Sequence, residues 1–354
     1  MRGLVKRIVL IVLVVLLSIT AAATQAKLPD AKLHSLVLEG INLTWEENYS
    51  GADSVFQYII REFPEHPAGY LYQGGVILAR AMDNEMEVDP ARFDSLIDRG
   101  RRKAKSLIDS GSDLVWGHFY IGTADGSDSY ARVYRGDWFG GTRRGFASVS
   151  SFKDAVKLDS TLCDAYAGIG AFYYWRSRKT EFFNWIPFVG DDRPEAFALL
   201  KRSVDKGIYN RYTALSLLVA IYIDAGMYDE AKACCLRGLK RYPENRAFLW
   251  GLATACHKAE MWSEAAAAYR QLLDAIVQSK DNNHYNEIVC RLNLAKVNVE
   301  ARDSSEVPRL LKDIVKFHQS DFPKHLFSRA KDKLEQAEEM LRKYAISPTP
   351  VGRQ

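Results

Sequence analysis

The sequence has little that would support catalysis, metal binding or binding to nucleic acid. It contains only seven His and five Cys residues, and it lacks the H-E-x-x-H, C-x-x-C, G-x-S-x-G and G-x-x-x-x-G-K motifs. The 48 Lys and Arg residues exceed the 44 Asp and Glu residues by only four, which is too few for a polyanion-binding surface. We therefore expect a non-enzymatic protein that holds no cofactor or metal and does not bind nucleic acid.

Long hydrophobic runs are also absent after the first 26 residues. Residues 1–26 begin with three cations, continue with an apolar stretch over residues 8–19 and end in small residues up to Ala26. This order is typical of a secretory signal peptide, so we expect export to the periplasm, the extracellular space or the cell envelope. An uncleaved amino-terminal helix that anchors the chain in the membrane remains open, although its apolar core is short for a membrane span.

The five Cys residues favour free thiols over a disulfide framework. Their number is odd, and several fall on apolar helix positions, where Cys behaves as a small hydrophobic residue. A bridge between Cys235 and Cys256, on neighbouring predicted helices, remains an alternative.

An internal repeat of 34 residues organises the second half of the chain. Seven positions recur at this spacing: Leu215, Val219, Tyr222, Gly226, Tyr228, Ala231 and Pro243 correspond to Leu249, Ala253, Cys256, Glu260, Trp262, Ala265 and Val277. Two helices of about 14 residues fit each unit, with small residues where the helices cross. The order of large, small and aromatic residues and the turn sequences ending at Ala231 and Ala265 resemble the tetratricopeptide repeat.

This resemblance implies an all-α fold, a right-handed α-solenoid of helical hairpins. We expect seven units, at about residues 33–66, 67–114, 115–162, 163–211, 212–245, 246–279 and 287–320, within a solenoid over residues 33–320. An amphipathic helix over residues 324–344 is expected to cap the stack, and residues 345–354 are expected to be a disordered tail.

Units two to four are longer, because their spacing is 48 residues. Two sets of small residues recur at this spacing: Gly74, Gly122 and Gly170, and Gly100, Ser148 and Ala196. We interpret the 14 additional residues of each unit as insertions between its two helices, which would stack at one edge of the solenoid. The first insertion is acidic, and the second and third are rich in aromatic residues and Arg.

These two insertions provide the candidate binding residues. Aromatic and Arg side chains are enriched at interaction hot spots, although the aromatic residues of the insertions could instead pack on one another as a small core. The candidates are Tyr134, Arg135, Trp138, Phe139, Arg143, Arg144, Trp175, Arg176, Arg178, Phe183, Trp185 and Phe188.

We expect an exported protein-interaction adaptor or scaffold that binds protein partners, or a small anionic or hydrophobic ligand, through its concave surface and this edge. Three alternatives remain open. The protein could be a periplasmic accessory protein that binds a small ligand for a solute-uptake system, the aromatic residues could insert into a membrane surface, or the chain could be a peptidoglycan enzyme with Glu181 as its acid.

Overall fold

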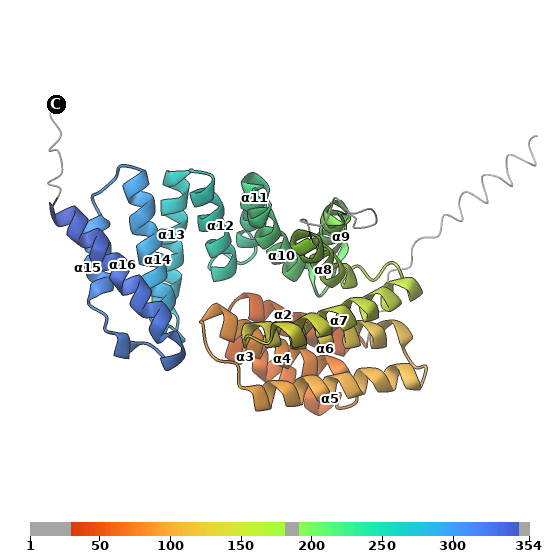
Figure 1. Cartoon of the computed structure of the whole chain (residues 1–354). Helices are drawn as coiled ribbons and strands as arrows, with labels where there is room; N and C mark the ends of the chain where they lie inside the picture. The colour runs from red at the N-terminus through yellow and green to blue at the C-terminus, as the bar shows by residue number, and fades with distance from the viewer. Residues whose placement is uncertain (1–29, 181–190, 347–354) are drawn as a thin grey trace, which may run out of the picture.

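The computed structural model describes residues 30–180 and 191–346, and these residues form helices and no strands. Fifteen α-helices follow one another along the chain (Figure 1). They are α2 (Ala31–Trp45), α3 (Tyr49–Glu62), α4 (Pro67–Asp83), α5 (Pro90–Asp109), α6 (Leu114–Tyr134), α7 (Trp138–Leu158), α8 (Ala165–Thr180), α9 (Arg193–Lys206), α10 (Arg211–Asp224), α11 (Tyr228–Leu239), α12 (Arg246–Lys258), α13 (Trp262–Gln278), α14 (Tyr285–Glu300), α15 (Val307–Val315) and α16 (Phe327–Ile346).

Consecutive helices pack in seven antiparallel pairs, from α2 and α3 to α14 and α15, and α16 packs on the last pair. The all-α solenoid predicted from the sequence is therefore confirmed. Figure 1 shows α2 to α7 as a lower block, with the arc of α8 to α13 above it and α14 to α16 at one end. The predicted signal peptide and the last eight residues lie outside the described residues.

Many helices start at a side-chain cap that the sequence provides. The side-chain oxygens of Asp30, Asn48, Asp89, Asp113, Asp137 and Asn245 accept backbone N–H groups in the first turn of the following helix. Capping satisfies donors that have no partner within the helix. Helix α5 and helix α4, which is capped by the His66 ring, also begin with Pro, which fits the first turn because it has no N–H to lose.

The turn inside a helix pair follows one pattern along the chain. Six of these turns contain one residue with a positive φ, namely Glu47, Glu85, Gly136, Gly226, Glu260 and Arg302. The left-handed conformation ends the first helix and lets the chain reverse within a few residues. Gly226 and Glu260 are the residues that the 34-residue repeat aligns.

The first two of the three 48-residue units, which form the second and third helix pairs, differ from the expectation of inserted connectors. Their additional residues lengthen the helices: α6 and α7 have 21 residues each, whereas α10 and α11 of a 34-residue unit have 14 and 12. Adding seven residues to each of two paired helices adds about two turns to each and keeps their contact face in register. In these two pairs the extra residues thus extend the hairpin instead of forming a loop. In the fourth pair α8 and α9 have 16 and 14 residues, and residues 181–190 between them lie outside the described residues.

Small residues lie where the helices of a pair cross, as the sequence columns predict. A Cβ atom on Gly122 of α6 would lie 2.6 Å from the ring of Phe152 on α7, and one on Gly100 of α5 would lie 2.4 Å from Leu71 on α4. Glycine therefore permits a backbone approach that a side chain would block.

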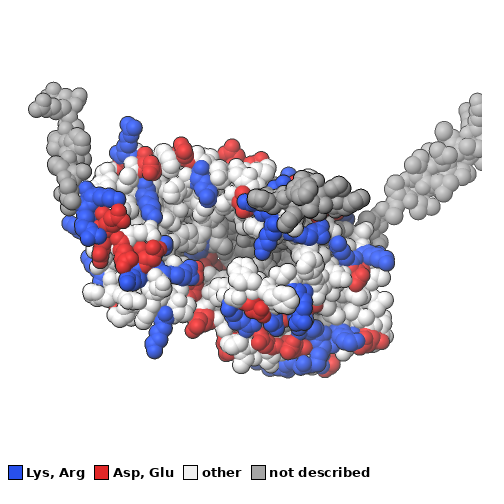
Figure 2. Space-filling view, viewed as in Figure 1, with Lys and Arg blue, Asp and Glu red and all other residues white. Residues whose placement is uncertain are grey.

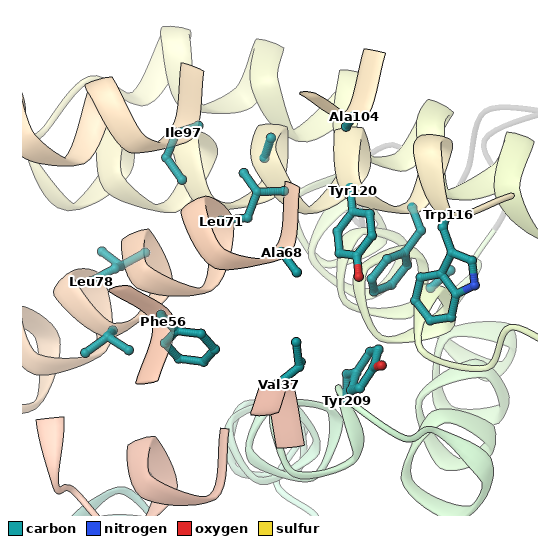
Figure 3. Packing of buried hydrophobic residues seen from close by; sticks show 14 of the residues in the cluster. Val37, Phe56, Ala68, Leu71, Leu78, Ile97, Ala104, Trp116, Tyr120 and Tyr209 are labelled. Carbon is teal, nitrogen blue, oxygen red and sulfur yellow. The ribbon is translucent and has the colours of Figure 1, made fainter. Parts of the chain in front are cut away.

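The inner face of the first four pairs is filled by aromatic side chains (Figure 3). Tyr209, in the turn before α10, has its ring centroid 6.1 Å from that of Tyr72 and 5.6 Å from that of Trp116. Its hydroxyl lies 2.7 Å from Nδ1 of His34 on α2. The buried Asp164 fixes this turn because its Oδ1 accepts the N–H groups of residues 208–210 at 2.7–2.9 Å.

The first two pairs also contact the last ones through polar side chains, which we call the clasp. Arg246, at the start of α12, lies buried between Glu47 and Asp83, with its Nε 3.0 Å from Glu47 Oε2. The other members of the clasp are the ion pairs Arg80 with Asp281 and Glu85 with Arg329. Burial, together with the negative charge of Asp83, raises the pKa of Glu47 to about 8.

All five Cys residues are free, and four of them are buried. The alternative of a Cys235–Cys256 bridge is therefore not what the structure contains. Burial raises the pKa of the Cys234, Cys235, Cys256 and Cys290 thiols, which is typical of thiols that serve as small core side chains.

Candidate functional site

The aromatic residues of the second predicted insertion lie on α7 and are exposed. The exposed fraction is 62% for Trp138, 87% for Phe139 and 55% for Phe146. Phe146 contacts Phe172 of α8 edge to face, at a centroid distance of 4.8 Å. We call this surface the α7–α8 edge: it comprises Trp138, Phe139, Arg143, Phe146 and Lys153 of α7, and Phe172, Tyr173, Arg176 and Lys179 of α8.

The expectation that residues 134–145 form an insertion between the two helices is wrong. Only residues 135–137 connect the helices, and Trp138 begins α7. Asp137 caps this helix through a 2.8 Å hydrogen bond from the N–H of Gly140, and this bond and Arg132 lower the pKa of Asp137. A Cβ atom on Gly141 would lie 2.6 Å from Val133 of α6, so this glycine serves close helix packing.

Four of the five candidate Arg residues pair with carboxylates of the chain itself. Arg135 pairs with Asp94, Arg144 with Asp125, Arg176 with Asp192 and Arg178 with Asp224. Arg143 makes none of the ion pairs recorded among the described residues. The guanidinium groups therefore mainly hold neighbouring helices together, and only Arg143 remains available to a partner in the way that the sequence suggested.

Arg144 belongs to a half-buried network that joins α5, α6 and α7. Asp125 and Asp128, one turn apart on α6, are both buried. Arg101 of α5 lies 3.1 Å from Asp125, and Arg144 of α7 lies 3.0 Å from Asp125 and 2.8 Å from Asp128. Arg132 adds a third guanidinium at 2.8 Å from Asp128. Buried charges are costly unless they are paired. This network therefore holds α5, α6 and α7 together beneath the edge.

Cations on the edge lie over aromatic rings. Lys179 is 5.6 Å from the ring centroid of Trp138, and Lys153 is 4.9 Å from that of Tyr173. Arg176 lies over the rings of Phe172 and Tyr173, at 5.6 and 5.0 Å. Such contacts are attractive within about 6 Å. The edge is thus a mixed surface in which positive charge and aromatic area alternate.

Two other candidates have roles inside the chain. The hydroxyl of Tyr134 donates to the carbonyl of Met86, at 2.8 Å, and so closes the turn between α4 and α5. Trp175 is half-buried and packs edge to face on Tyr174, at a centroid distance of 5.2 Å. Phe183, Trp185, Phe188 and Glu181 lie outside the described residues.

The acidic first insertion has a different place from the one expected. Asp83 and Glu85 belong to the clasp, and Asp89 caps α5. These three side chains are therefore used within the chain. The same segment contacts the second predicted insertion, because the Met86 carbonyl accepts from Tyr134 and Asp94 pairs with Arg135. Phe146, Lys153 and Phe172 lie outside the predicted insertions and were therefore missed as edge residues, whereas Lys179 belongs to the third one. Helical spacing would have placed Phe146 two turns after Trp138, and Lys179 two turns after Phe172.

The two cavities that we describe lie away from the edge. One, of about 400 Å³, opens between the turn after α3 and helix α5 and is lined by Glu65, Tyr70, Arg99, Arg102 and Lys103, with Pro64. The other is much smaller and lies in the clasp. Figure 2 shows the surface hollowed between the lower and upper blocks of helices.

Two further searches cover the described residues only. Within residues 30–180 and 191–346, no three His, Cys, Asp or Glu side chains are arranged to hold a metal ion. In the same part of the chain, no helix combines the length and the apolar character needed to cross a membrane.

Comparison with known proteins finds a similarity to one family over part of the chain. A family model described as a tetratricopeptide repeat matches residues 217–279, and no curated protein sequence matches the chain. Among solved structures the chain is similar to PilW, a widely conserved type IV pilus biogenesis factor, with 15% identity and a TM-score of 0.41, over 69% of this chain and 98% of that one. It is also similar to the C-terminal part of a TPR repeat-containing protein from Cytophaga hutchinsonii, with 16% identity and a TM-score of 0.43, over 84% and 99% of the two chains. The matched residues lie within α10 to α13, the fifth and sixth helix pairs, so this part of the chain is similar to tetratricopeptide repeats.

Proposed function

We propose that the protein is a non-enzymatic interaction scaffold of the cell envelope, and that it binds a partner protein through the α7–α8 edge. The observation that carries this proposal is the exposure of Trp138, Phe139 and Phe146 within the first three turns of one helix. Exposed aromatic side chains in one place are costly in water and mark interaction sites in soluble proteins.

The edge is a rigid platform, which favours binding with little loss of conformational entropy. The buried ion-pair network around Asp125 and Asp128 holds α7 against α6 and α5. The inner face of the first four pairs, by contrast, is filled around Tyr209. The proposal therefore assigns partner binding chiefly to the edge, instead of to the concave surface.

The location in the envelope rests on residues 1–26, whose composition is that of an export signal. Fractionation of cells that express the full chain, followed by amino-terminal sequencing, tests this part. Recovery of the chain in the cytoplasm with residues 1–26 intact would overturn it.

A binary binding experiment tests the edge. The wild-type chain and a Trp138→Ala/Phe139→Ala variant are used to capture proteins from a solubilised envelope fraction, and each captured protein is then purified and titrated against both chains. We expect at least one partner whose affinity falls about tenfold or more in the variant, because aromatic hot spots dominate interface energies.

The matched control is Leu236→Ala/Val277→Ala, which removes two similarly exposed apolar side chains, on α11 and α13, away from the edge. This control should bind as the wild type does, and far-UV circular dichroism should show the same helix content for all three chains. Equal binding by the wild type and the Trp138→Ala/Phe139→Ala variant would contradict the proposal.

A further inference from the structure

Helices α7 and α8 are far more basic than the chain as a whole. They carry seven cations and one acid, Asp154, whereas the whole chain is nearly balanced at 48 cations and 44 acids. Figure 2 shows Lys and Arg side chains grouped in the region of α8. The cations are Arg143, Arg144, Lys153, Lys157, Arg176, Arg178 and Lys179.

Part of this charge is not compensated within the described chain. Arg144, Arg176 and Arg178 have carboxylate partners. Arg143, Lys153 and Lys179 make none of the ion pairs recorded for the described residues, and two of the three lie over aromatic rings of the edge. A cation over a ring keeps its N–H donors free on the side away from the ring. These donors therefore face outward, where a partner carboxylate can reach them.

We propose that the α7–α8 edge binds an acidic amphipathic segment of its partner, with carboxylates on Arg143, Lys153 and Lys179 and apolar side chains on Trp138 and Phe146. This inference rests on the proposed function and names the chemistry of the partner. Lys179 lies by Trp138, at the start of α7, and Lys153 lies 15 residues further along the same helix, so the two ammonium groups are separated by roughly 20 Å. A partner helix of about four turns spans this distance.

The same chemistry could in principle meet an anionic membrane, but the arrangement favours a protein segment. Membrane-binding helices separate an apolar face, which enters the lipid, from a polar face, which stays in the headgroup region. On this edge Lys179 covers the face of Trp138, and Lys153 covers that of Tyr173. The cations therefore lie directly on the aromatic rings, and the edge has no separate apolar face. This suits a partner in which carboxylates and apolar side chains alternate.

The test uses the full chain and two model peptides of about 15 residues. One peptide has Leu on one helical face and Glu beside it, and the other has Lys in place of each Glu. Binding is followed by fluorescence anisotropy of the labelled peptides. We expect the acidic peptide to bind about tenfold or more tightly than the basic one and to lose affinity as salt is raised.

Charge reversal identifies the residues. Lys153→Glu/Lys179→Glu should weaken binding of the acidic peptide about tenfold or more, whereas Lys240→Glu/Lys258→Glu, which reverses two exposed Lys residues on other helix pairs, should leave it unchanged. Equal binding of both peptides, or no effect of the reversal at residues 153 and 179, overturns the inference. Binding to vesicles that contain phosphatidylglycerol without binding of either peptide also overturns it, in favour of a membrane surface.

The proposed function can survive this failure, and the two results are separable. A partner captured from the envelope that is lost with Trp138→Ala/Phe139→Ala but kept with Lys153→Glu/Lys179→Glu supports a scaffold that binds at the edge and overturns the acidic partner.

Discussion

His66 shows how a single buried side chain links local structure to the stability of the whole chain. It caps α4 by accepting the N–H of Ala68 on Nδ1, at 3.2 Å. Its ring packs edge to face on that of Tyr120, at a centroid distance of 5.3 Å. Burial lowers the pKa of His66 to about 4. The neutral imidazole is therefore the form that fits the fold.

We expect the free energy of unfolding to fall as the pH falls from about 6.5 to about 4, because the unfolded chain then binds a proton on His66 that the native chain excludes. The contribution is fully present above the unfolded pKa. A shift of this size corresponds to about 3 kcal/mol. His66→Asn retains a capping side chain but does not titrate, so the difference between the two chains in urea unfolding, measured from pH 7 to pH 4, isolates this effect. Parallel pH profiles would exclude it.

The candidate residues differ in how well the sequence predicted their role. Trp138 and Phe139 were singled out for composition alone, and both are exposed. Tyr134 and Arg144 have the same composition signature, yet their polar atoms are used within the chain, by the Met86 carbonyl and by Asp125. A sequence gives residue types, but the pairing of a guanidinium with a carboxylate on the neighbouring helix depends on packing that the sequence alone does not specify.

At the scale of the helix pair, the turn residue with a positive φ is the repeated element. In the 34-residue units this place is taken by Gly226 and then by Glu260, with φ values of 73° and 59°. An L-residue pays about 1–2 kcal/mol for this conformation, and glycine does not. The sequence repeat aligned these two residues, but it could not show that Glu260 adopts the conformation at a cost.

Exchanging residues at these equivalent positions should have opposite effects. We expect Glu260→Gly to raise the free energy of unfolding by about 0.5–1 kcal/mol, and Gly226→Ala to lower it by about 1 kcal/mol. No Cβ contact lies within 4 Å of Gly226, so the loss would reflect backbone conformation and not a clash. Urea unfolding of the two variants and the wild type, at one pH, gives both values. Changes of the same sign would rule out this explanation.

The helix pairs also explain why the first two insertions were misinterpreted as connectors. A spacing of 48 residues is consistent with a loop of 14 residues or with two helices that are each two turns longer. Gly140 and Gly141 favoured the loop, because glycine is unfavourable within a helix. The structure uses them within α7, where Gly141 allows close approach to α6. The order and pairing of the helices followed from periodicity, whereas this choice depended on contacts between helices.

The arrangement of the whole chain depends on the clasp, which no periodicity indicated. Helix periodicity describes contacts between neighbours along the chain, and Arg246 and Asp83 are 163 residues apart. Trp45 strengthens the same junction by stacking on Phe248, at a centroid distance of 5.5 Å. The clasp ties the start of the array to its end, so the folded chain resists opening more than an array with free ends would.

Replacing Arg246 by Met should therefore destabilise the chain as a whole. The variant leaves the carboxyl groups of Glu47 and Asp83 buried without their cation, and breaking a buried ion pair in this way costs about 3–5 kcal/mol. We expect a lower urea midpoint, faster hydrogen exchange in α2, α4 and α12, and a larger radius of gyration in small-angle scattering. Arg309→Met, which removes an exposed Arg of α15, is the control and should change none of these.

Protonation of Glu47 gives the same prediction an independent check. Because its pKa is raised from 4.5 to about 8, the native chain binds a proton that the unfolded chain releases, so this contribution is fully present below pH 4.5 and is lost as the pH rises to about 8. Glu47→Gln mimics the protonated form, and between pH 6.5 and 8 its stability should fall less than that of the wild type, by at most about 1.4 kcal/mol per pH unit. His66 contributes equally to the wild type and to Glu47→Gln, so its titration cancels in the difference between the two chains. If Glu47→Gln leaves the pH dependence unchanged, the pKa of Glu47 is not raised by folding, and Glu47 faces Arg246 as a carboxylate over this whole interval.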